Sequence, residues 1–271
     1  MKKRLVSAEI KKIEVEILSN IVSFCQKYQL RVYLSGGTLL GAIRHHGFIP
    51  WDDDIDVCMP RRDYERFIRL FQSKKEYIKV QSLLDSDFSA PFAKVVDLRT
   101  SIKSEFSNRD IDQHLWVDVF PIDGLPENLE EVKKIYAKCD CYRKIYLLID
   151  ATLVKGKTKI RKYMKYILKP LANLYGKKRC CDKIEAIAKS YPYENYEYVG
   201  AITWGLYGAG ERMLKSEFEK TVMVEFEGRQ FPTFSCWDSY LKGLYGDYMQ
   251  LPPVEQRVAK HDAVFADLNT P

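Results

Sequence analysis

The sequence predicts an α+β fold, in which a mixed sheet with flanking helices is followed by a largely helical C-terminal part. Short segments rich in β-branched and aromatic residues alternate with helical patterns up to residue 127, and longer helical patterns dominate from Asn128 onward. With 271 residues, 46% of them hydrophobic and 13% aromatic, the chain can bury a sizeable core. We therefore expect a core formed by residues 1–127 and a helical part, residues 128–271, that packs on it.

Helical spacing of apolar residues and short apolar runs predict the elements of the first part. Ile10, Ile13 and Ile17 lie on one stripe of an amphipathic helix. A strand leads into Ser35-Gly36-Gly37-Thr38, and the next helix follows this turn. The expected elements are helices over 7–28, 39–44 and 62–71 and strands over 30–34, 55–59, 77–83, 92–98 and 115–120.

The second part is expected to be mainly helical. The segment 155–179 is basic, with Tyr, Ile and Leu interleaved. Two short apolar runs flank Glu227-Gly228-Arg229 and predict a hairpin. The expected elements are helices over 129–153, 181–190 and 237–245, the last ending at Gly246, and hairpin strands over 222–226 and 230–234.

Charge and cysteine content exclude several classes of protein. Lys and Arg exceed Asp and Glu by 43 − 37, and a net charge of +6 is too small to indicate nucleic acid binding. The seven cysteines include no CxxC pair and are accompanied by four histidines, which argues against structural zinc. No apolar run approaches the ~20 residues of a membrane-spanning helix. The first residues lack the apolar core of a secretory signal, so a cytoplasmic protein is expected.

A cluster of acidic residues precedes the strand expected over 55–59. Four carboxylates, those of Asp52, Asp53, Asp54 and Asp56, occupy five positions, where like charges repel. If the segment is extended, Asp52, Asp54 and Asp56 share one face and Asp53 points to the other. A divalent cation would remove the repulsion. The alternative is a solvated acidic turn.

The turn Ser35-Gly36-Gly37-Thr38 joins a strand to a helix. Backbone N–H groups and the helix dipole suit a phosphate at such a place, and the two glycines allow a ligand to approach the backbone closely. The acidic cluster follows some 18 residues later. Backbone donors and a metal ion together would hold the phosphates of a nucleotide.

A further carboxylate, Asp118, interrupts the apolar strand expected over 115–120. A buried carboxylate is costly unless it is paired or bound to a metal. We interpret Asp118 as a third metal ligand, with an ion pair to an arginine as the alternative. Asp123, in the turn before Gly124, can be either structural or catalytic on this reasoning.

Two long motifs give the chain a family resemblance. The segments SGGTLLGAIRHHGFIPWDDDID, residues 35–56, and LYGDYMQLPP, residues 244–253, resemble the LicD family of phosphocholine transferases, within the nucleotidyltransferase (DNA polymerase β-like) superfamily. The resemblance implies a nucleotidyltransferase-like core. It also implies transfer of a phospho-substituent, such as phosphocholine, from a CDP- or CMP-activated donor to a sugar hydroxyl of a cell-surface glycan or its lipid-linked precursor, with release of CMP.

The resemblance also assigns roles to residues. Asp54, Asp56 and Asp118 would be the catalytic carboxylates and would bind Mg²⁺ or Mn²⁺, with Asp118 also a candidate general base. Gly36 and Gly37 would form the phosphate side of the site. The remaining candidates are Thr38, Arg44 and Lys94 for donor binding, Asp52, His46, Arg257 and His261 near the site, and Trp204 and Tyr207 as an aromatic cage for a quaternary ammonium group.

Other functions remain open from the sequence. A nucleotidyltransferase that moves a nucleoside monophosphate from a triphosphate would use the same carboxylates and release pyrophosphate. A non-enzymatic phosphate- or metal-binding module would release neither product. For the basic stretch 163–175, a solvated helix face is one interpretation, and contact with the inner face of a membrane that carries the acceptor is the other. The transferred group and the acceptor glycan are not identified by the sequence.

Overall fold

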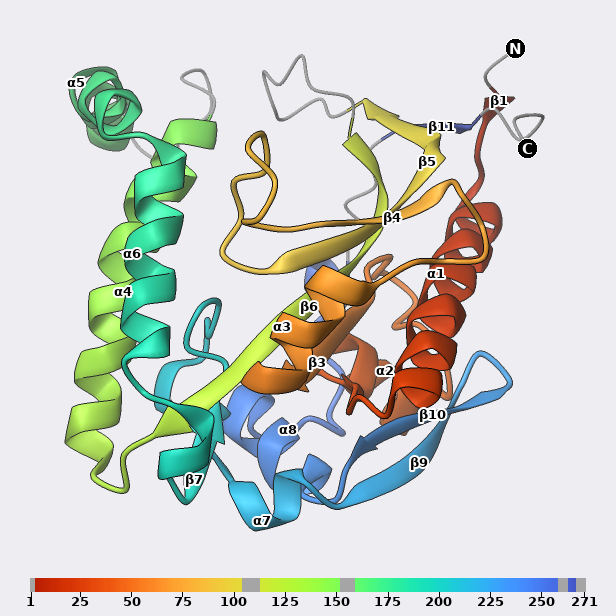
Figure 1. Cartoon of the computed structure of the whole chain (residues 1–271). Helices are drawn as coiled ribbons and strands as arrows, with labels where there is room; N and C mark the ends of the chain where they lie inside the picture. Colours follow the sequence, from red (N-terminus) through yellow and green to blue (C-terminus); the bar gives the residue numbers. More distant parts are fainter. Residues whose placement is uncertain (1–2, 104–112, 152–158, 258–262, 267–271) are drawn as a thin grey trace.

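The computed structural model describes residues 3–103, 113–151, 159–257 and 263–266, and its centre is a nine-stranded mixed sheet (Figure 1). Six strands follow one another across the sheet, and β4 and the β7–β8 pair extend it at β5 and β6. In spatial order the six are β1 (Lys3–Arg4), β11 (Ala263–Ala266), β5 (Ala93–Lys103), β6 (Gln113–Leu125), β3 (Asp56–Pro60) and β2 (Tyr33–Leu34), and the others are β4 (Ile78–Gln81), β7 (Tyr198–Gly200) and β8 (Met213–Leu214).

Pairing in the sheet is mixed. The β3–β6 pair is parallel, while β2–β3, β5–β6, β4–β5 and β11–β5 are antiparallel. A separate hairpin is formed by β9 (Thr221–Phe226) and β10 (Arg229–Phe234). The α+β class predicted from the sequence is confirmed.

Helices flank this sheet and form a separate arm beside it. Figure 1 shows α4 and α6 side by side at the left, with α5 at their upper end. The helices are α1 (Ser7–Tyr28), α2 (Gly36–His45), α3 (Arg61–Leu70), α4 (Leu129–Asp150), α5 (Lys159–Tyr175), α6 (Lys177–Lys189), α7 (Lys215–Phe218) and α8 (Trp237–Tyr245).

The largest hydrophobic cluster joins both parts of the chain. Ile17 of α1 and Val57 of β3 are fully buried in the same cluster as Phe226, Phe234 and Leu241. Apolar side chains from both sides of residue 128 therefore share one core. A smaller cluster, which includes Val132, Ile135, Cys139, Ile184 and Ala188, holds α4 and α6 together. The division of the chain into parts at residue 128 stays a prediction.

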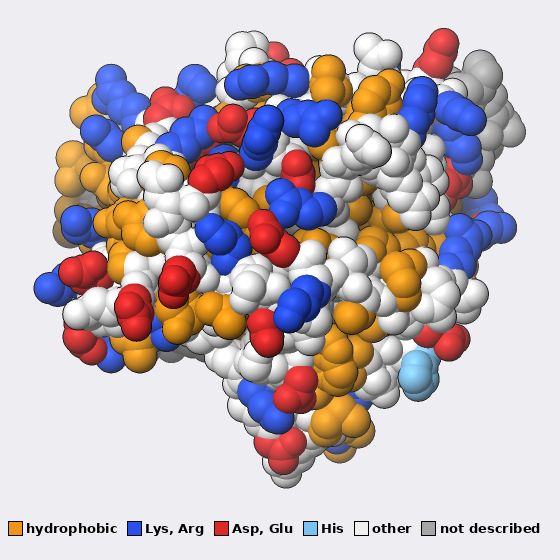
Figure 2. Space-filling model, turned by 60° about the horizontal axis from the view of Figure 1, so that its bottom comes forward, with side chains coloured by type: hydrophobic (Ala, Val, Ile, Leu, Met, Phe, Trp, Pro, Cys, Tyr) orange, Lys and Arg blue, Asp and Glu red, His pale blue; other side chains and the backbone are white. Residues whose placement is uncertain are grey.

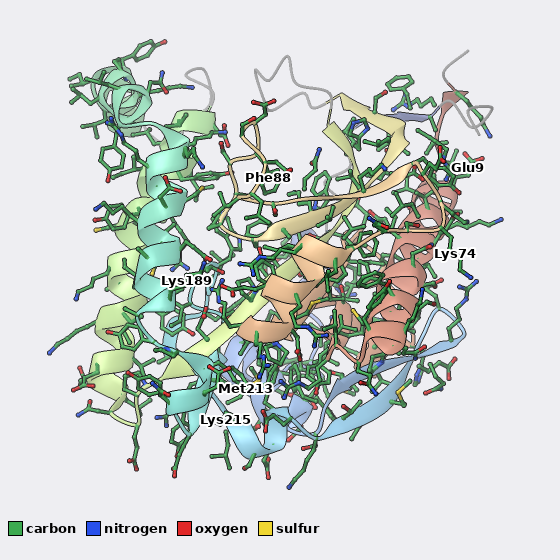
Figure 3. All side chains as sticks on the ribbon, in the orientation of Figure 1. Glu9, Lys74, Phe88, Lys189, Met213 and Lys215 are labelled. Atoms are coloured by element: carbon green, nitrogen blue, oxygen red, sulfur yellow. The ribbon has the colours of Figure 1, made fainter. Side chains whose placement is uncertain are left out.

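A buried ion network fastens the arm to the sheet. Arg61, at the start of α3, donates to both carboxylate oxygens of Asp123 at 2.6 and 2.7 Å and to Glu185 of α6 at 2.7 Å. Arg61 and Asp123 are 8% and 1% exposed, so the pair is desolvated. On α6, Lys189 adds a contact with Glu65 of α3 at 3.2 Å (Figure 3). Asp123, whose role the sequence left open, is a structural partner of Arg61.

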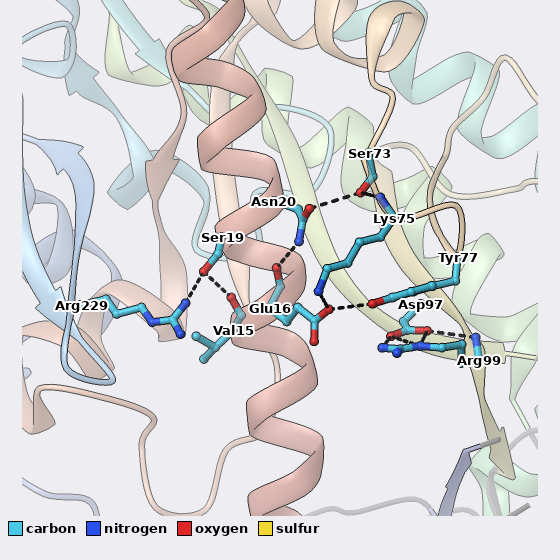
Figure 4. Close-up of polar contacts among 10 residues, drawn as sticks. All are labelled: Val15, Glu16, Ser19, Asn20, Ser73, Lys75, Tyr77, Asp97, Arg99 and Arg229. Atoms are coloured by element: carbon cyan, nitrogen blue, oxygen red, sulfur yellow. Dashed lines mark hydrogen bonds and ion pairs between the residues drawn. The ribbon is translucent and has the colours of Figure 1, made fainter. Parts of the chain in front are cut away.

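Polar contacts also fix α1 along its exposed side (Figure 4). The Glu16 carboxylate forms an ion pair with Lys75 and accepts a hydrogen bond from the Tyr77 hydroxyl at 3.0 Å. On the other side of the helix, Arg229 donates to the Ser19 hydroxyl at 2.9 Å. The hairpin and the segment before β4 are therefore both tied to α1.

The expected elements are found, with differences at their ends. Helices 7–28 and 237–245 have the predicted bounds, and the hairpin forms around Glu227 and Gly228, whose positive φ values of 50° and 69° suit a tight hairpin turn. The predicted strand 30–34 is wrong in extent, because only Tyr33 and Leu34 pair with β3. The helix expected from residue 39 begins at Gly36, so the glycine turn is its first turn. Strands β1, β7, β8 and β11 were not predicted.

The surface carries both charge signs. On the face seen in Figure 2, Lys and Arg side chains are interspersed with Asp and Glu rather than gathered in one large patch. Within the residues that the structure describes, no helix is long and apolar enough to cross a membrane.

Candidate active site

The parallel β3–β6 pair brings two of the predicted carboxylates together. Asp56, the first residue of β3, is the register partner of Asp118 on β6, and both side chains face the same side of the sheet. The Asp118 N–H donates to the Ile55 carbonyl at 2.9 Å, which holds the two strands in this register. On the other neighbour of β6, Lys94 is the partner of Asp118, and its ammonium lies 3.3 Å from Asp118 Oδ1. The predicted residues Asp56, Asp118 and Lys94 are thus adjacent.

The glycine turn lies directly against these carboxylates. Gly36 adopts a left-handed φ of +54°, and a Cβ atom there would lie 2.8 Å from Asp56 Oδ2. A Cβ atom at Gly37 would lie 3.0 Å from Asp52 Oδ2. A side chain at position 36 would be strained and would press on the Asp56 carboxylate. Two motifs that are about twenty residues apart in sequence therefore form one site.

Hydrogen bonds hold the turn in place. The Thr38 hydroxyl accepts from the Asp56 N–H at 2.8 Å, and the Gly36 N–H donates to the Tyr240 hydroxyl at 3.2 Å. Thr38 thus connects the first turn of α2 to β3. Ser35, the N-cap residue, makes no side-chain capping bond. The N-terminus of α2 is therefore not capped by its own side chain, a suitable place for an anion.

The acidic segment is not a strand before Asp56, which corrects the predicted extended geometry. Residues 52–55 are irregular, because the Asp52 N–H bonds to the Ile49 carbonyl at 2.9 Å and forms a turn after Pro50. Strand alternation therefore does not determine the direction of Asp52, Asp53 and Asp54. The carboxylates of Asp52 and Asp54 instead lie close enough that each affects the pKa of the other.

The cluster carries negative charge that the protein does not fully compensate. Burial, and then the charges of Asp54 and Asp118, raise the pKa of Asp56 well above its usual value. Burial and the neighbouring Asp52 raise the pKa of Asp54 to about 7, although part of this residue stays in contact with solvent. Burial also raises the pKa of Asp118, and the charge of Lys94 opposes this shift. Asp118 Oδ1 is buried without a well-formed hydrogen bond.

The donor chemistry fits a hard divalent cation. Carboxylate oxygens are the ligands that Mg²⁺ and Mn²⁺ prefer. Such an ion would stabilise the mutually repelling carboxylates, whose charge Lys94 offsets only in part. As the side chains stand in the described ranges, no three His, Cys, Asp or Glu residues converge on one point that would hold an ion. Binding would therefore require side-chain rotation within the cluster.

One acidic residue near the cluster was not predicted. Glu14 of α1 is 3% exposed, and its Oε2 atom has no hydrogen-bond partner. Burial, followed by the charges of Asp53 and Asp54, raises its pKa well above the usual value. The signal was present in the sequence, because position 14 lies four residues after Ile10 and three before Ile17, on the buried stripe of the helix.

A pocket of about 160 Å³ opens beside the cluster. The glycine turn and Asp56 form one wall, and α8 and the segment 201–211 form the other. Trp204 and Tyr207, predicted as an aromatic cage, both line it. Glu211, Tyr240 and Tyr245 also line the pocket and were not predicted from the sequence. Burial raises the pKa of Glu211 to about 7.

A hairpin residue holds the loop that leads into the acidic segment. The Glu227 N–H donates to the His46 carbonyl at 3.0 Å, and its Oε1 accepts from the Phe48 N–H at 3.1 Å. A Cβ atom at Gly47 would lie 2.4 Å from this oxygen. The turn of the β9–β10 hairpin therefore clamps the loop over residues 46–48.

The remaining basic candidates lie around the site with other partners. Arg44 donates to the Tyr248 carbonyl at 2.7 Å and to His45 at 2.9 Å. His46 is exposed and ends α2 with a positive φ of 57°. Arg257 stacks over the ring of Trp51 at 5.6 Å and donates to the Pro252 carbonyl at 2.7 Å. His261 lies outside the described residues. The role of Arg44 in donor binding and the place of the other three near the site stay predictions.

The chain is similar to a known protein family and to proteins of several bacteria. A family model described as "LicD/FKTN/FKRP, nucleotidyltransferase domain" matches residues 29–146. The lipopolysaccharide cholinephosphotransferase LicD of Haemophilus influenzae is 34% identical over 266 residues, which cover 96% of this chain and 97% of that protein. An uncharacterized protein of Rickettsia typhi is 31% identical over 61 residues, 22% of this chain and 20% of its own. One of Rickettsia prowazekii is 35% identical over 48 residues, 18% of each chain.

Proposed function

This chain belongs to the LicD family, and we propose that it is a transferase that moves phosphocholine from a CDP-activated donor to a hydroxyl of a cell-surface glycan, releasing CMP. The Haemophilus influenzae relative, a lipopolysaccharide cholinephosphotransferase, aligns over nearly the whole length of both chains and supports this activity. The observation that carries the proposal is the contact of the glycine turn with Asp56 and Asp52, next to Asp118. This arrangement offers anion-binding N–H groups and carboxylates at one place.

In the proposed reaction, the chain's own residues orient the donor and handle a proton. The N–H groups at the start of α2 bind donor phosphate oxygens. The sugar hydroxyl attacks the phosphorus that bears choline, the bond between that phosphorus and the CMP oxygen breaks, and Asp118 accepts the hydroxyl proton. Lys94, 3.3 Å from Asp118, favours the ionised carboxylate that a general base requires.

We propose that Asp54, Asp56 and Asp118 hold Mg²⁺ or Mn²⁺ in this state. The ions, when bound, neutralise the donor diphosphate and stabilise the charge that develops on the leaving CMP. Asp52, in contact with Asp54, stays an additional candidate.

The helix α5 supports a second part of the proposal, contact with an anionic membrane that carries the acceptor. Ile167, Leu171 and Leu174 are 70%, 62% and 81% exposed. The helix has five basic residues and no acidic one in its sequence: Lys159, Arg161, Lys162, Lys165 and Lys169. Exposed apolar residues with surrounding basic residues are typical of helices that lie at a lipid surface.

Product analysis tests the activity. The full-length protein is incubated with CDP-choline labelled in its methyl groups, choline-free lipopolysaccharide and Mg²⁺, and then with EDTA in place of Mg²⁺. We expect labelled glycan and an equal amount of CMP with Mg²⁺ and neither with EDTA. Pyrophosphate release from CTP without CMP release from CDP-choline would instead indicate a nucleotidyltransferase, and release of neither would indicate a binding module.

A further inference from the structure

The pocket beside Asp56 is acidic and aromatic. Among the described residues that line it, the charged ones are Asp56 and Glu211, and none is Lys or Arg. Its other prominent side chains are Trp204, Tyr207 and Tyr245. Apart from the N–H groups of the glycine turn, the side chains of this lining favour a cation over an anion.

Glu211 is the more deeply buried of the two charged groups of this lining. It is 5% exposed and accepts a hydrogen bond from the Tyr207 N–H at 2.9 Å. In the part of the chain that the structure describes, it forms no ion pair within 4.0 Å. The charge of the buried Arg143 offsets that of Glu211 in part. A cation bound in direct contact with the carboxylate would offset it further.

The aromatic rings around Glu211 are held in fixed positions. The rings of Tyr207 and Tyr245 meet edge to face with centroids 5.1 Å apart. Trp204 packs against Phe92 at 5.2 Å and Tyr146 at 5.8 Å, also edge to face. Tyr207 is 48% exposed and lies where the pocket meets solvent. Pre-formed aromatic walls are the usual way to bind a quaternary ammonium group.

We infer that this pocket binds the cationic headgroup of the donor, with Glu211 as its counter-charge and Trp204, Tyr207 and Tyr245 as its cage. This inference rests on the proposed function. The volume of the pocket, about 160 Å³, is below the ~300–1,000 Å³ of pockets that hold whole drug-sized ligands. This size favours a headgroup over a nucleoside as the ligand.

The location agrees with the connectivity of the donor. In a CDP-activated donor, the headgroup is bonded through oxygen to the same phosphorus that the acceptor attacks, whereas the nucleoside lies beyond the second phosphate. A headgroup pocket must therefore adjoin the catalytic carboxylates, and this pocket shares Asp56 and the glycine turn with them. Glu211 and the cage would determine which headgroup is transferred.

Direct binding tests the inference without catalysis. Titration calorimetry on the full-length protein with Mg²⁺ uses phosphocholine, phosphoethanolamine and CMP as separate probes. Glu211→Gln removes the charge at constant size, and Tyr207→Leu removes an exposed cage ring with little risk to folding. Glu225→Gln, at an exposed position of β9, is the matched control.

We expect Glu211→Gln and Tyr207→Leu each to weaken phosphocholine binding about tenfold or more and to change CMP binding less than twofold. Glu225→Gln should change neither. Unchanged phosphocholine binding in both cage variants would overturn the inference, as would an equal loss of CMP binding, which would identify a nucleoside pocket.

The transfer assay separates this inference from the proposed function. Wild-type protein that releases CMP from CDP-choline while Tyr207→Leu keeps the wild-type ratio of kcat/KM for CDP-choline over CDP-ethanolamine would refute the headgroup pocket alone. Wild-type protein that binds phosphocholine through Glu211 but transfers nothing would refute the proposed function alone.

Discussion

The β3–β6 strand pair and the helix α5 differ in what they leave without a partner. Around the strands it is buried negative charge, and on the helix it is exposed apolar surface. Around β3 and β6, the backbone N–H groups of Asp56, Asp118 and Gly36 donate hydrogen bonds of 2.8–3.2 Å that hold these residues in place. The negative charge buried there is nevertheless only partly compensated. On α5, the apolar side chains of Ile167 and Leu174 are 70% and 81% exposed. Buried charge indicates a charged ligand, and exposed apolar surface indicates an apolar environment. Under the proposed function, the first region would bind the ionic donor and the second would contact the membrane that carries the acceptor.

The largest expected effect comes from Asp118→Asn. The substitution keeps the size of the side chain and removes its charge, so the strand should still fold, while the proposed base and metal ligand are lost. CMP release should fall by at least roughly 10²–10⁴-fold, with donor binding retained at raised Mg²⁺. Steady-state CMP release and donor titration measure the two effects. Wild-type turnover by this variant would show that the base is another residue.

Comparison of Asp53→Asn with Asp54→Asn and Asp56→Asn would sharpen the assignment within the cluster. The proposed ligands are Asp54 and Asp56, so their variants should lose roughly 10²-fold or more in kcat, whereas Asp53→Asn should retain far more activity. Strand alternation does not distinguish Asp53 from its neighbours, because residues 52–55 are irregular, so the comparison of variants tests this assignment. Equal losses in all three variants would mean that Asp53 belongs to the ligand set.

The buried carboxylate of Glu211 predicts that the stability of the folded protein depends on pH. Its pKa in the folded protein, raised by burial from 4.5 to about 7, means that the folded state keeps a proton that the unfolded state releases between these values. Wild-type stability should therefore fall, relative to Glu211→Gln, as the pH rises from about 4.5 to 7, by on the order of 3 kcal/mol. Urea unfolding at pH 5 and pH 8 measures the difference. A constant difference between the two proteins would contradict the prediction.

The smallest expected effect concerns α5. Ile167→Ser with Leu174→Ser should weaken sedimentation with vesicles that contain phosphatidylglycerol by roughly tenfold, because less apolar area is available for burial. Turnover of CDP-choline with a soluble acceptor should stay unchanged. Leu129→Ser, which removes an apolar residue of 47% exposure from the far end of the arm, is the control. Equal vesicle binding by all three proteins would leave α5 without a lipid role.

Local patterns predicted the elements that are determined locally. The apolar stripe of α1, the positive-φ turn at Glu227-Gly228 and the Gly246 cap of α8 are each set by neighbouring residues. In contrast, β11 pairs with β5 at a separation of more than 150 residues, and no short pattern specifies such a partner. The extended geometry expected for residues 52–54 was wrong, because residues 52–55 form no strand and follow a turn closed by the Asp52 N–H and the Ile49 carbonyl.

The residues of the candidate site were predictable where a local sequence pattern distinguishes them, and not where only the folded chain brings them together. A carboxylate within an apolar strand identified Asp118, and the Gly-Gly turn identified the wall beside Asp56. Glu211 ends a short 3₁₀ helix, Gly208–Glu211, whose sequence has no apolar periodicity, so only the three-dimensional structure reveals that it faces the same pocket.

The clamp that Glu227 places on the loop over residues 46–48 has a consequence for how the enzyme is made. All of the proposed catalytic carboxylates have been synthesised by residue 118, yet the loop before them is held by a side chain 180 positions after Gly47. A ribosome must therefore translate more than a hundred further residues before the site can be assembled, whereas an N-terminal domain usually folds as soon as it emerges. An incomplete chain that ends before the hairpin carries the acids without the clamp, so premature termination should yield inactive fragments.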